Sequence, residues 1–344
     1  MTDAEASSRS WSDIALGGLL LVAGAVGILG GRAASSGGLN GIDGLDAGGL
    51  PIALGGLLVA VGAALLVRGG FLPRRPAVRW RFGTLLVVVL VIAAIDVIVA
   101  LEHMRSGWIT EFALRFGPPE IAALSALLFA VAIALARLSR LRAVGMVLLG
   151  LLLATVGLDI ATGQTRLTLG LEPLVQGIDP IVVLLGLIIV ADGVLCLVSP
   201  SLLLATYGRR VAGWREPAIP TIAAAGLRVV AVLAIAGAAG LAFQLHARVW
   251  DIGALSVFGL FGIAAKLAGW HRLVLIFALA RGDVVEQSVR QTMMMSTGNP
   301  MILLQRPISA TLLLLAGAVL ATAALLSVRS ATDSERAAST PRPR

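Results

Sequence analysis

Long apolar runs separated by short arginine-bearing loops limit this chain more than any other feature. A membrane-spanning helix needs about 20 apolar residues, and about ten segments of the sequence approach that length. The runs are unbroken rather than alternating, which favours helices over the strands of a barrel. The sequence therefore predicts an all-α polytopic transmembrane helical bundle of about 9–10 spanning helices. The expected spans lie near 14–31, 50–67, 82–101, 119–136, 141–158, 180–198, 222–245, 252–269, 272–296 and 308–328.

Composition and charge agree with a lipid bilayer as the main partner. The chain is 58% hydrophobic and 13% charged, whereas a soluble domain carries about 25% charged residues. The net charge of +8 comes from arginines in loops and tails. Since no basic patch interleaved with aromatics accompanies them, we expect no nucleic-acid partner. With one cysteine, Cys196, and three scattered histidines, the sequence predicts no disulfide, no metal centre and no cofactor.

Loop charge predicts the orientation. The loop at 68–81 and the shorter loops at 137–142 and 209–215 are rich in arginine, while the loops between them are mixed or acidic. Arginine-rich loops remain in the cytoplasm, so the N-terminus is expected there too. The segment 272–296 turns charged after Ala280, so it is either a full crossing or a half-helix or re-entrant hairpin. The polar segment 331–344 is expected to be disordered.

One internal repeat is present: IALGGLL at 14–20 recurs at 52–58. Small residues also recur every four positions, at Ala23, Gly27 and Gly31 in the first helix and at Gly56, Ala60 and Ala64 in the second. Such spacing lets helix backbones approach closely in lipid. The repeat predicts helix packing, whether it arose by duplication or by convergence.

Two blocks of sequence resemble a known transporter family. The first runs through FALRFGPPE at 112–120, GLLLATVGLD at 150–159 and GLEPLVQGI at 170–178. The second runs from Val249 through EQSVRQ at 286–291 and STGNPM at 296–301 to RPIS at 306–309. Their order and spacing resemble the large permease subunit of tripartite tricarboxylate transporters (TctA-like). The chain is truncated relative to that permease. Its N-terminal helix pair resembles the small subunit (TctB-like).

The resemblance divides the chain into residues 1–78, small-subunit-like; 79–330, a truncated permease-like transmembrane domain; and 331–344, the tail. It implies a component of a secondary transporter for tricarboxylates or other carboxylates, driven by an ion gradient. The implied partners are a periplasmic solute-binding protein and other transporter or complex subunits. The implied location is the bacterial inner (cytoplasmic) membrane, as a multi-pass protein.

A second hypothesis follows from what the chain lacks. The permease family carries Pro-Gly motifs in each of two halves, but none of the 14 prolines here is followed by glycine. Interrupted helices of that kind expose backbone groups to substrate in the middle of the membrane. The alternative is therefore a non-transporting, degenerate permease that serves as a scaffold or accessory subunit of a larger complex.

Candidate residues for an ion or substrate pathway are few. Asp96 and Asp192 lie deep in expected spans, where an ionised carboxylate costs at least ~2.5–3.5 kcal/mol on insertion scales. Each is either part of a proton or sodium relay or a carboxyl used for packing. Lys266, the single lysine, is expected at a membrane interface. The remaining candidates lie where glycine and proline would break a helix: Ser296, Thr297, Asn299 and Arg306.

No enzyme motif is found. The sequence contains no phosphate-binding glycine loop with lysine, no Gly-x-Ser-x-Gly and no His-Glu-x-x-His, which are the motifs that carry the corresponding chemistries. The chain is predicted not to be an enzyme.

Overall fold

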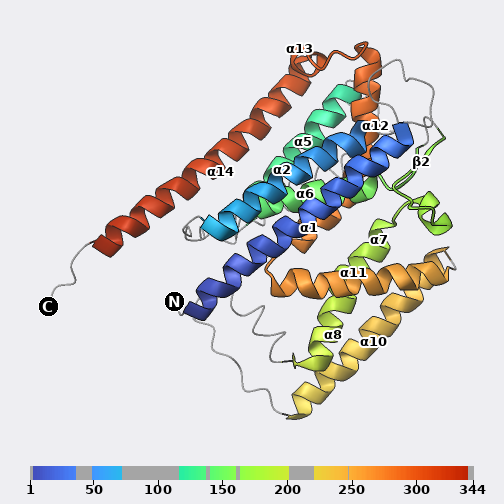
Figure 1. Cartoon of the computed structure of the whole chain (residues 1–344), viewed down its shortest axis with the longest axis vertical. Coiled ribbons are helices and arrows are strands. Elements are labelled where there is room, and N and C mark those ends of the chain that lie inside the picture. Colours follow the sequence, from blue (N-terminus) through green and yellow to red (C-terminus); the bar gives the residue numbers. More distant parts are fainter. Residues whose placement is uncertain are drawn as a thin grey trace, which may run out of the picture.

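A computed structural model describes residues 3–35, 49–71, 116–136, 140–159, 163–200, 221–246 and 248–339. These residues are almost entirely helical, which confirms the predicted all-α bundle (Figure 1). The longer helices are α1 (Asp3–Ser35), α2 (Gly49–Phe71), α5 (Pro118–Leu135), α6 (Arg140–Ala154), α10 (Thr221–His246), α11 (Val249–Leu267), α12 (Arg272–Met295) and α14 (Pro307–Ser339). The shorter elements are β1 (Gly157–Leu158), β2 (Thr165–Arg166), η2 (Glu172–Gln176), α7 (Pro180–Leu184), η3 (Leu185–Val190), α8 (Ala191–Val198) and α13 (Ile302–Gln305).

Seven helical segments of the described residues are long and apolar enough to cross a membrane. They correspond to seven of the expected spans: α1, α2, α5, the continuous α7–η3–α8 segment, α10, α11 and α14. The span expected at 82–101 lies outside the described residues. The span expected at 141–158 is the 15-residue helix α6, which ends at Ala154 because the chain then turns into the β-hairpin.

α12 answers the question that the sequence left open at 272–296. It is a single unbroken helix of 24 residues, about 36 Å long at 1.5 Å per residue, so it contains no re-entrant turn. α12 carries too many charged residues to count among the apolar helices that could cross a membrane. It nevertheless packs inside the bundle against α6 and α5, with Phe277 edge-on to Phe129 of α5.

α14 extends beyond the expected end of its span at residue 328 and continues to Ser339. The segment 331–339 is therefore helical where its polar composition predicts disorder. Alanine, glutamate and arginine in this segment are good helix formers, and adding residues to an existing helix avoids the cost of nucleation.

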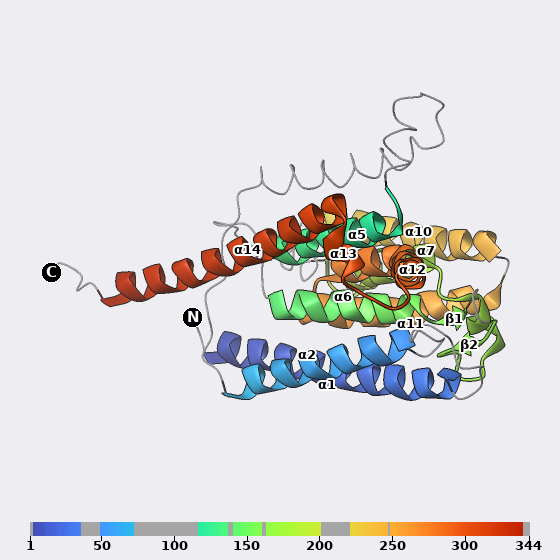
Figure 2. The same cartoon turned by 90° about the horizontal axis from the view of Figure 1, so that it is seen from above.

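α1 and α2 form a close antiparallel pair, and they lie side by side in both views (Figures 1 and 2). A Cβ added at Gly17 would lie 2.8 Å from the carbonyl oxygen of Gly62, and one at Gly55 would lie 2.6 Å from that of Gly24. The first glycine of each repeat copy is thus a contact position. The second glycines, Gly18 and Gly56, face open space.

The small residues that were expected to pack in the second helix lie on an exposed face of α2, so this prediction was wrong. Gly56, Ala60 and Ala64 are all exposed, whereas in the first helix Gly27 and Gly31 are buried. Spacing alone does not say which small-residue stripe faces the partner, because α2 has more than one such stripe.

The bundle has two distinct ends. At the first, which we call the Asp13 end, Asp13 of α1 contacts Arg142 of α6 at 2.5 Å and Arg68 of α2 at 4.0 Å. Arg68 and Arg142, one from each of two arginine-rich segments, therefore lie at this end. The second, the hairpin end, carries β1 and β2, where Leu167 packs on Gly30 near the end of α1. Predicted orientation would place the hairpin end on the periplasmic side.

Candidate functional site: a charged cavity at the hairpin end

A two-stranded hairpin after α6 positions the first arginine of the site. Gly157 pairs with Arg166, and Leu158 pairs with Thr165. Gly157 has a φ of 130°, and a Cβ there would lie 2.9 Å from the backbone nitrogen of Gly177. This position therefore requires glycine, and the close approach brings η2 and its flanking residues against the hairpin that carries Arg166.

Arg166 and Arg290 form a closed cluster with two carboxylates. Arg166 contacts Asp159 at 3.2 Å and Glu286 at 2.7 Å. Arg290, one turn after Glu286 on α12, contacts both of the same carboxylates at 3.1 Å. The side chains of Arg166 and Arg290 are only 5% and 9% exposed. Buried charges need such partners, because an unpaired charge in a low-dielectric interior is very costly.

Both arginines retain unused donors despite these contacts. The Nε atoms of Arg166 and Arg290 are buried and have no hydrogen-bond acceptor. Buried polar groups are normally satisfied, so each exception calls for an explanation. A guanidinium group presents its N–H donors in a planar fork that matches a carboxylate. The two free Nε donors therefore favour an additional anionic ligand.

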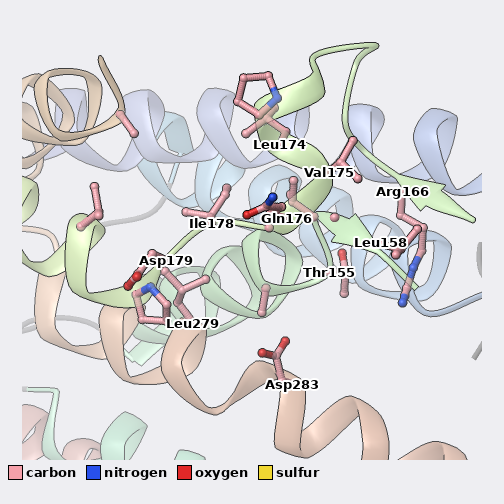
Figure 3. Close-up of a pocket in the computed structure, with 18 of the residues that line it drawn as sticks. Thr155, Leu158, Arg166, Leu174, Val175, Gln176, Ile178, Asp179, Leu279 and Asp283 are labelled. Atoms are coloured by element: carbon pink, nitrogen blue, oxygen red, sulfur yellow. The ribbon is translucent and has the colours of Figure 1, made fainter. Parts of the chain in front are cut away.

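A cavity of about 1510 Å³ adjoins this cluster. Arg166 lies at one end in Figure 3 and Asp179 at the other, while Asp283 points in from α12. Its charged lining comprises Arg166, Arg248, Arg290, Asp159, Asp179, Asp251, Asp283 and Glu286. Apolar side chains, including Leu158, Val175 and Phe258, supply much of the remaining wall. Mostly apolar walls with a few converging polar groups are typical of small-molecule sites.

Asp192 lies apart from this cavity, in a second cluster of charged residues. Its carboxylate accepts hydrogen bonds from Lys266 Nζ at 2.9 Å and Arg272 Nη1 at 3.0 Å. Arg272 Nη1 also donates to the carbonyl oxygen of Leu187 at 2.6 Å. Lys266, in the last turn of α11, is only 6% exposed. The attraction of Asp192 stabilises the buried lysine among the helices.

The helix η3, whose turns are wider than those of an α-helix, precedes Asp192. Helix α11 packs closely against η3. A Cβ at Gly262 of α11 would lie 2.6 Å from the carbonyl oxygen of Leu187. This glycine lets α11 pack directly on η3. The contact places Lys266, one turn further along α11, within reach of Asp192.

The structure does not gather the five described candidates, Asp192, Ser296, Thr297, Asn299 and Arg306, into one site. Ser296, Thr297 and Asn299 form the turn between α12 and α13, where Ser296 Oγ donates to Met293 O at 3.2 Å and Asn299 Oδ1 accepts from Met301 N at 2.9 Å. Thr297 and Gly298 have φ of 52° and 85°. Asp96 lies outside the described residues.

Arg306 pairs with Glu120 at 3.6 Å. Glu120 is 2% exposed and also accepts a hydrogen bond from Gly117 N at 2.9 Å. The pair joins the start of α5 to the start of α14. This contact gives Arg306 a role in holding two helices together.

Sequence reasoning missed the paired charges around the cavity as site residues. Glu286 and Arg290 are four positions apart, so one face of α12 carries both. Charges within an otherwise apolar bundle are a general indication of a functional position, and that signal was available in the sequence. The partners Asp159 and Arg166 could not be assigned to them, because they lie more than 100 residues away.

In a comparison with protein-family models, residues 83–202 match the tripartite tricarboxylate transporter TctA family. The matched segment includes Asp159, Arg166, Asp179 and Asp192. No match was found among curated proteins or among solved structures. The matched family is one of transporters rather than enzymes. Over residues 83–202 the chain is therefore similar to the TctA family, and the seven long apolar helical segments of its described residues support a multi-pass membrane protein.

Proposed function

We propose that this chain carries a carboxylate across the membrane and that the cavity at the hairpin end is its binding site. The observation that carries the proposal is the pair of unused Nε donors on the buried side chains of Arg166 and Arg290. A charge-assisted hydrogen bond to a carboxylate is about twice as strong as one between neutral groups. The predicted orientation would open the site to the periplasm, from which a solute-binding protein would deliver the ligand.

Charge balance gives a reason for an ion gradient to drive this transport. Five carboxylates and three guanidinium groups line the cavity. An entering carboxylate adds to an existing excess of negative charge, and like charges at close range cost more in a low-dielectric site than in water. A cation that enters with the ligand would offset this cost.

Uptake into proteoliposomes tests the proposal. We expect radiolabelled citrate to accumulate in vesicles that contain the purified chain, given an inward cation gradient and a periplasmic citrate-binding protein. Omitting the binding protein or the gradient should lower uptake at least tenfold. A matched control is the exposed Arg32 at the end of α1, for which Arg32→Gln should leave uptake unchanged.

Uptake no faster than in protein-free vesicles, under proton and sodium gradients alike, would contradict the proposal. That result would instead support the hypothesis of a scaffold or accessory subunit.

A further inference from the structure

Asp283 is the least compensated carboxylate of the cavity. Among the described residues it takes part in no hydrogen bond and no ion pair, although it lines the cavity and points into it (Figure 3). The neighbouring Gly282 packs against Ala154 of α6, which turns Asp283 to the cavity side of α12. This arrangement leaves one carboxylate facing the space that a ligand would occupy.

The other carboxylates of the cavity already have partners. Asp159 and Glu286 pair with Arg166 and Arg290. Asp179 accepts a hydrogen bond from the backbone nitrogen of Ile181 at 2.6 Å. Asp251 of α11 also interacts within the structure.

The charged groups that line the cavity with Asp283 come from four parts of the chain. Asp159 and Arg166 lie on the hairpin, and Glu286 and Arg290 lie on α12 itself. Asp179 precedes α7, while Arg248 and Asp251 lie at the start of α11. Arg248 donates to Gln176 of η2. Arg166 and Arg290 make their ion pairs with Asp159 and Glu286, so Asp283 has no ion pair of its own among the described residues.

Position along the helix makes this charge unusual. Asp283 lies at the middle of α12, a helix of about 36 Å against a hydrocarbon core of about 30 Å. Ionisable residues at such a depth face the interior of a bundle or a water-filled cavity, and the exposed side chain of Asp283 faces this cavity. Taking up a proton removes that charge. One carboxylate suffices to bind a proton, whereas a metal cation needs several oxygen ligands.

We propose that Asp283 is the residue that couples proton binding to carboxylate binding in the cavity, an inference that rests on the proposed function. A hydronium ion in the cavity transfers its proton to a carboxylate oxygen of Asp283. One O–H bond breaks in hydronium and one forms on Asp283, leaving water and a neutral carboxyl group. Loss of the negative charge favours the entering carboxylate, and by linkage the bound carboxylate favours the protonated form equally.

Asp192, which the sequence favoured for such a relay, is less suited to it. Lys266 and Arg272 both contact its carboxylate. Two adjacent positive charges favour the ionised form of a carboxylate. Asp192 therefore serves better as a fixed counter-charge than as a proton acceptor.

Calorimetric titration of citrate into the full-length protein in lipid nanodiscs tests the inference. Repeating the titration in buffers of different ionisation enthalpy gives the number of protons taken up per citrate bound. We expect the wild type to take up more protons than Asp283→Asn, by as much as one proton per citrate. Citrate titrates identically in both experiments, so the difference reports on the protein. Equal proton numbers would overturn the inference, as would sodium dependence of citrate binding that Asp283→Asn removes.

Two controls keep the inference separate from folding and from the proposed function. Glu172→Gln alters an exposed carboxylate on η2 and should match the wild type, and Asp283→Glu should retain proton uptake. If citrate gives no binding heat with the wild type, the proposed function fails. The inference is then tested by melting temperature between pH 5 and 8 without citrate. A pH dependence that differs between wild type and Asp283→Asn would support protonation of Asp283, on which the inference depends, and identical curves would overturn the inference.

Discussion

Replacing Arg166 by alanine should lower the free energy of unfolding by about 3–5 kcal/mol, the usual cost of breaking a buried ion pair. Asp159 and Glu286 would then share Arg290 alone, although both are largely buried. The measurement is unfolding in mixed detergent micelles by SDS titration. Arg32→Ala, at the exposed end of α1, should change stability by less than about 0.5 kcal/mol.

The cluster also predicts non-additive effects. Residues in one ion-pair network couple strongly, so the double replacement Arg166→Ala with Glu286→Ala should cost less than the sum of the single changes. Strictly additive free energies would show that the contacts between Arg166 and Glu286 contribute nothing. A loss below about 1 kcal/mol for Arg166→Ala, the range of an exposed pair, would contradict its buried position.

Replacing Asp192 by asparagine is expected to have a comparable effect at the second charged cluster, about 3–5 kcal/mol. Lys266 and Arg272 would lose their counter-charge while their side chains remain 2% and 12% exposed. The same SDS titration measures it. Asp192→Glu should be tolerated much better, because it keeps the charge.

A second change at this cluster separates loss of charge from loss of fit. Lys266→Met alone leaves Asp192 paired with Arg272, so it should cost less than Asp192→Asn. Combining Asp192→Asn with Lys266→Met should recover part of the loss, since one buried cation disappears with its partner. If the double variant is less stable than Asp192→Asn, the contact between Lys266 and Asp192 is not the source of the effect.

Much of the fold was predictable because the bilayer imposes a simple rule. A run of about 20 apolar residues has few alternatives to a spanning helix, so α1, α2, α5, α10, α11 and α14 were found from the sequence. α12 was harder to interpret, because Asp283, Glu286 and Arg290 line the cavity while other residues of the same helix pack against α5 and α6. A count of charges along the chain does not distinguish these two faces.

The site was less predictable than the fold for a related reason. Isolated intramembrane charges such as Asp192 stand out in a sequence, and Asp192 was selected for that reason. Its partners come from the end of α11 and the start of α12, and only the approach of α11 to η3 brings them together. Asp159, Glu286 and Arg290 were recognised as parts of family-like motifs, but their meeting with Arg166 depends on how the hairpin folds over α12.

Helix packing was likewise only partly predictable from the sequence. The repeat correctly indicated that α1 and α2 pack closely, and the first glycine of each copy is where the backbones meet. The particular stripe of small residues chosen in α2 was wrong. Period and residue size restrict the possible faces, while tertiary contacts decide among them.

Protection of a cysteine in the cavity by citrate tests the central claim most directly. Cys196 is the only cysteine, so Cys196→Ala gives a background to which Gln287→Cys, in the cavity lining, and Glu172→Cys, outside it, can each be added. The proposed site predicts that citrate slows maleimide labelling at position 287 at least tenfold and leaves position 172 unaffected. Equal labelling rates at position 287 with and without saturating citrate would contradict a carboxylate site in this cavity.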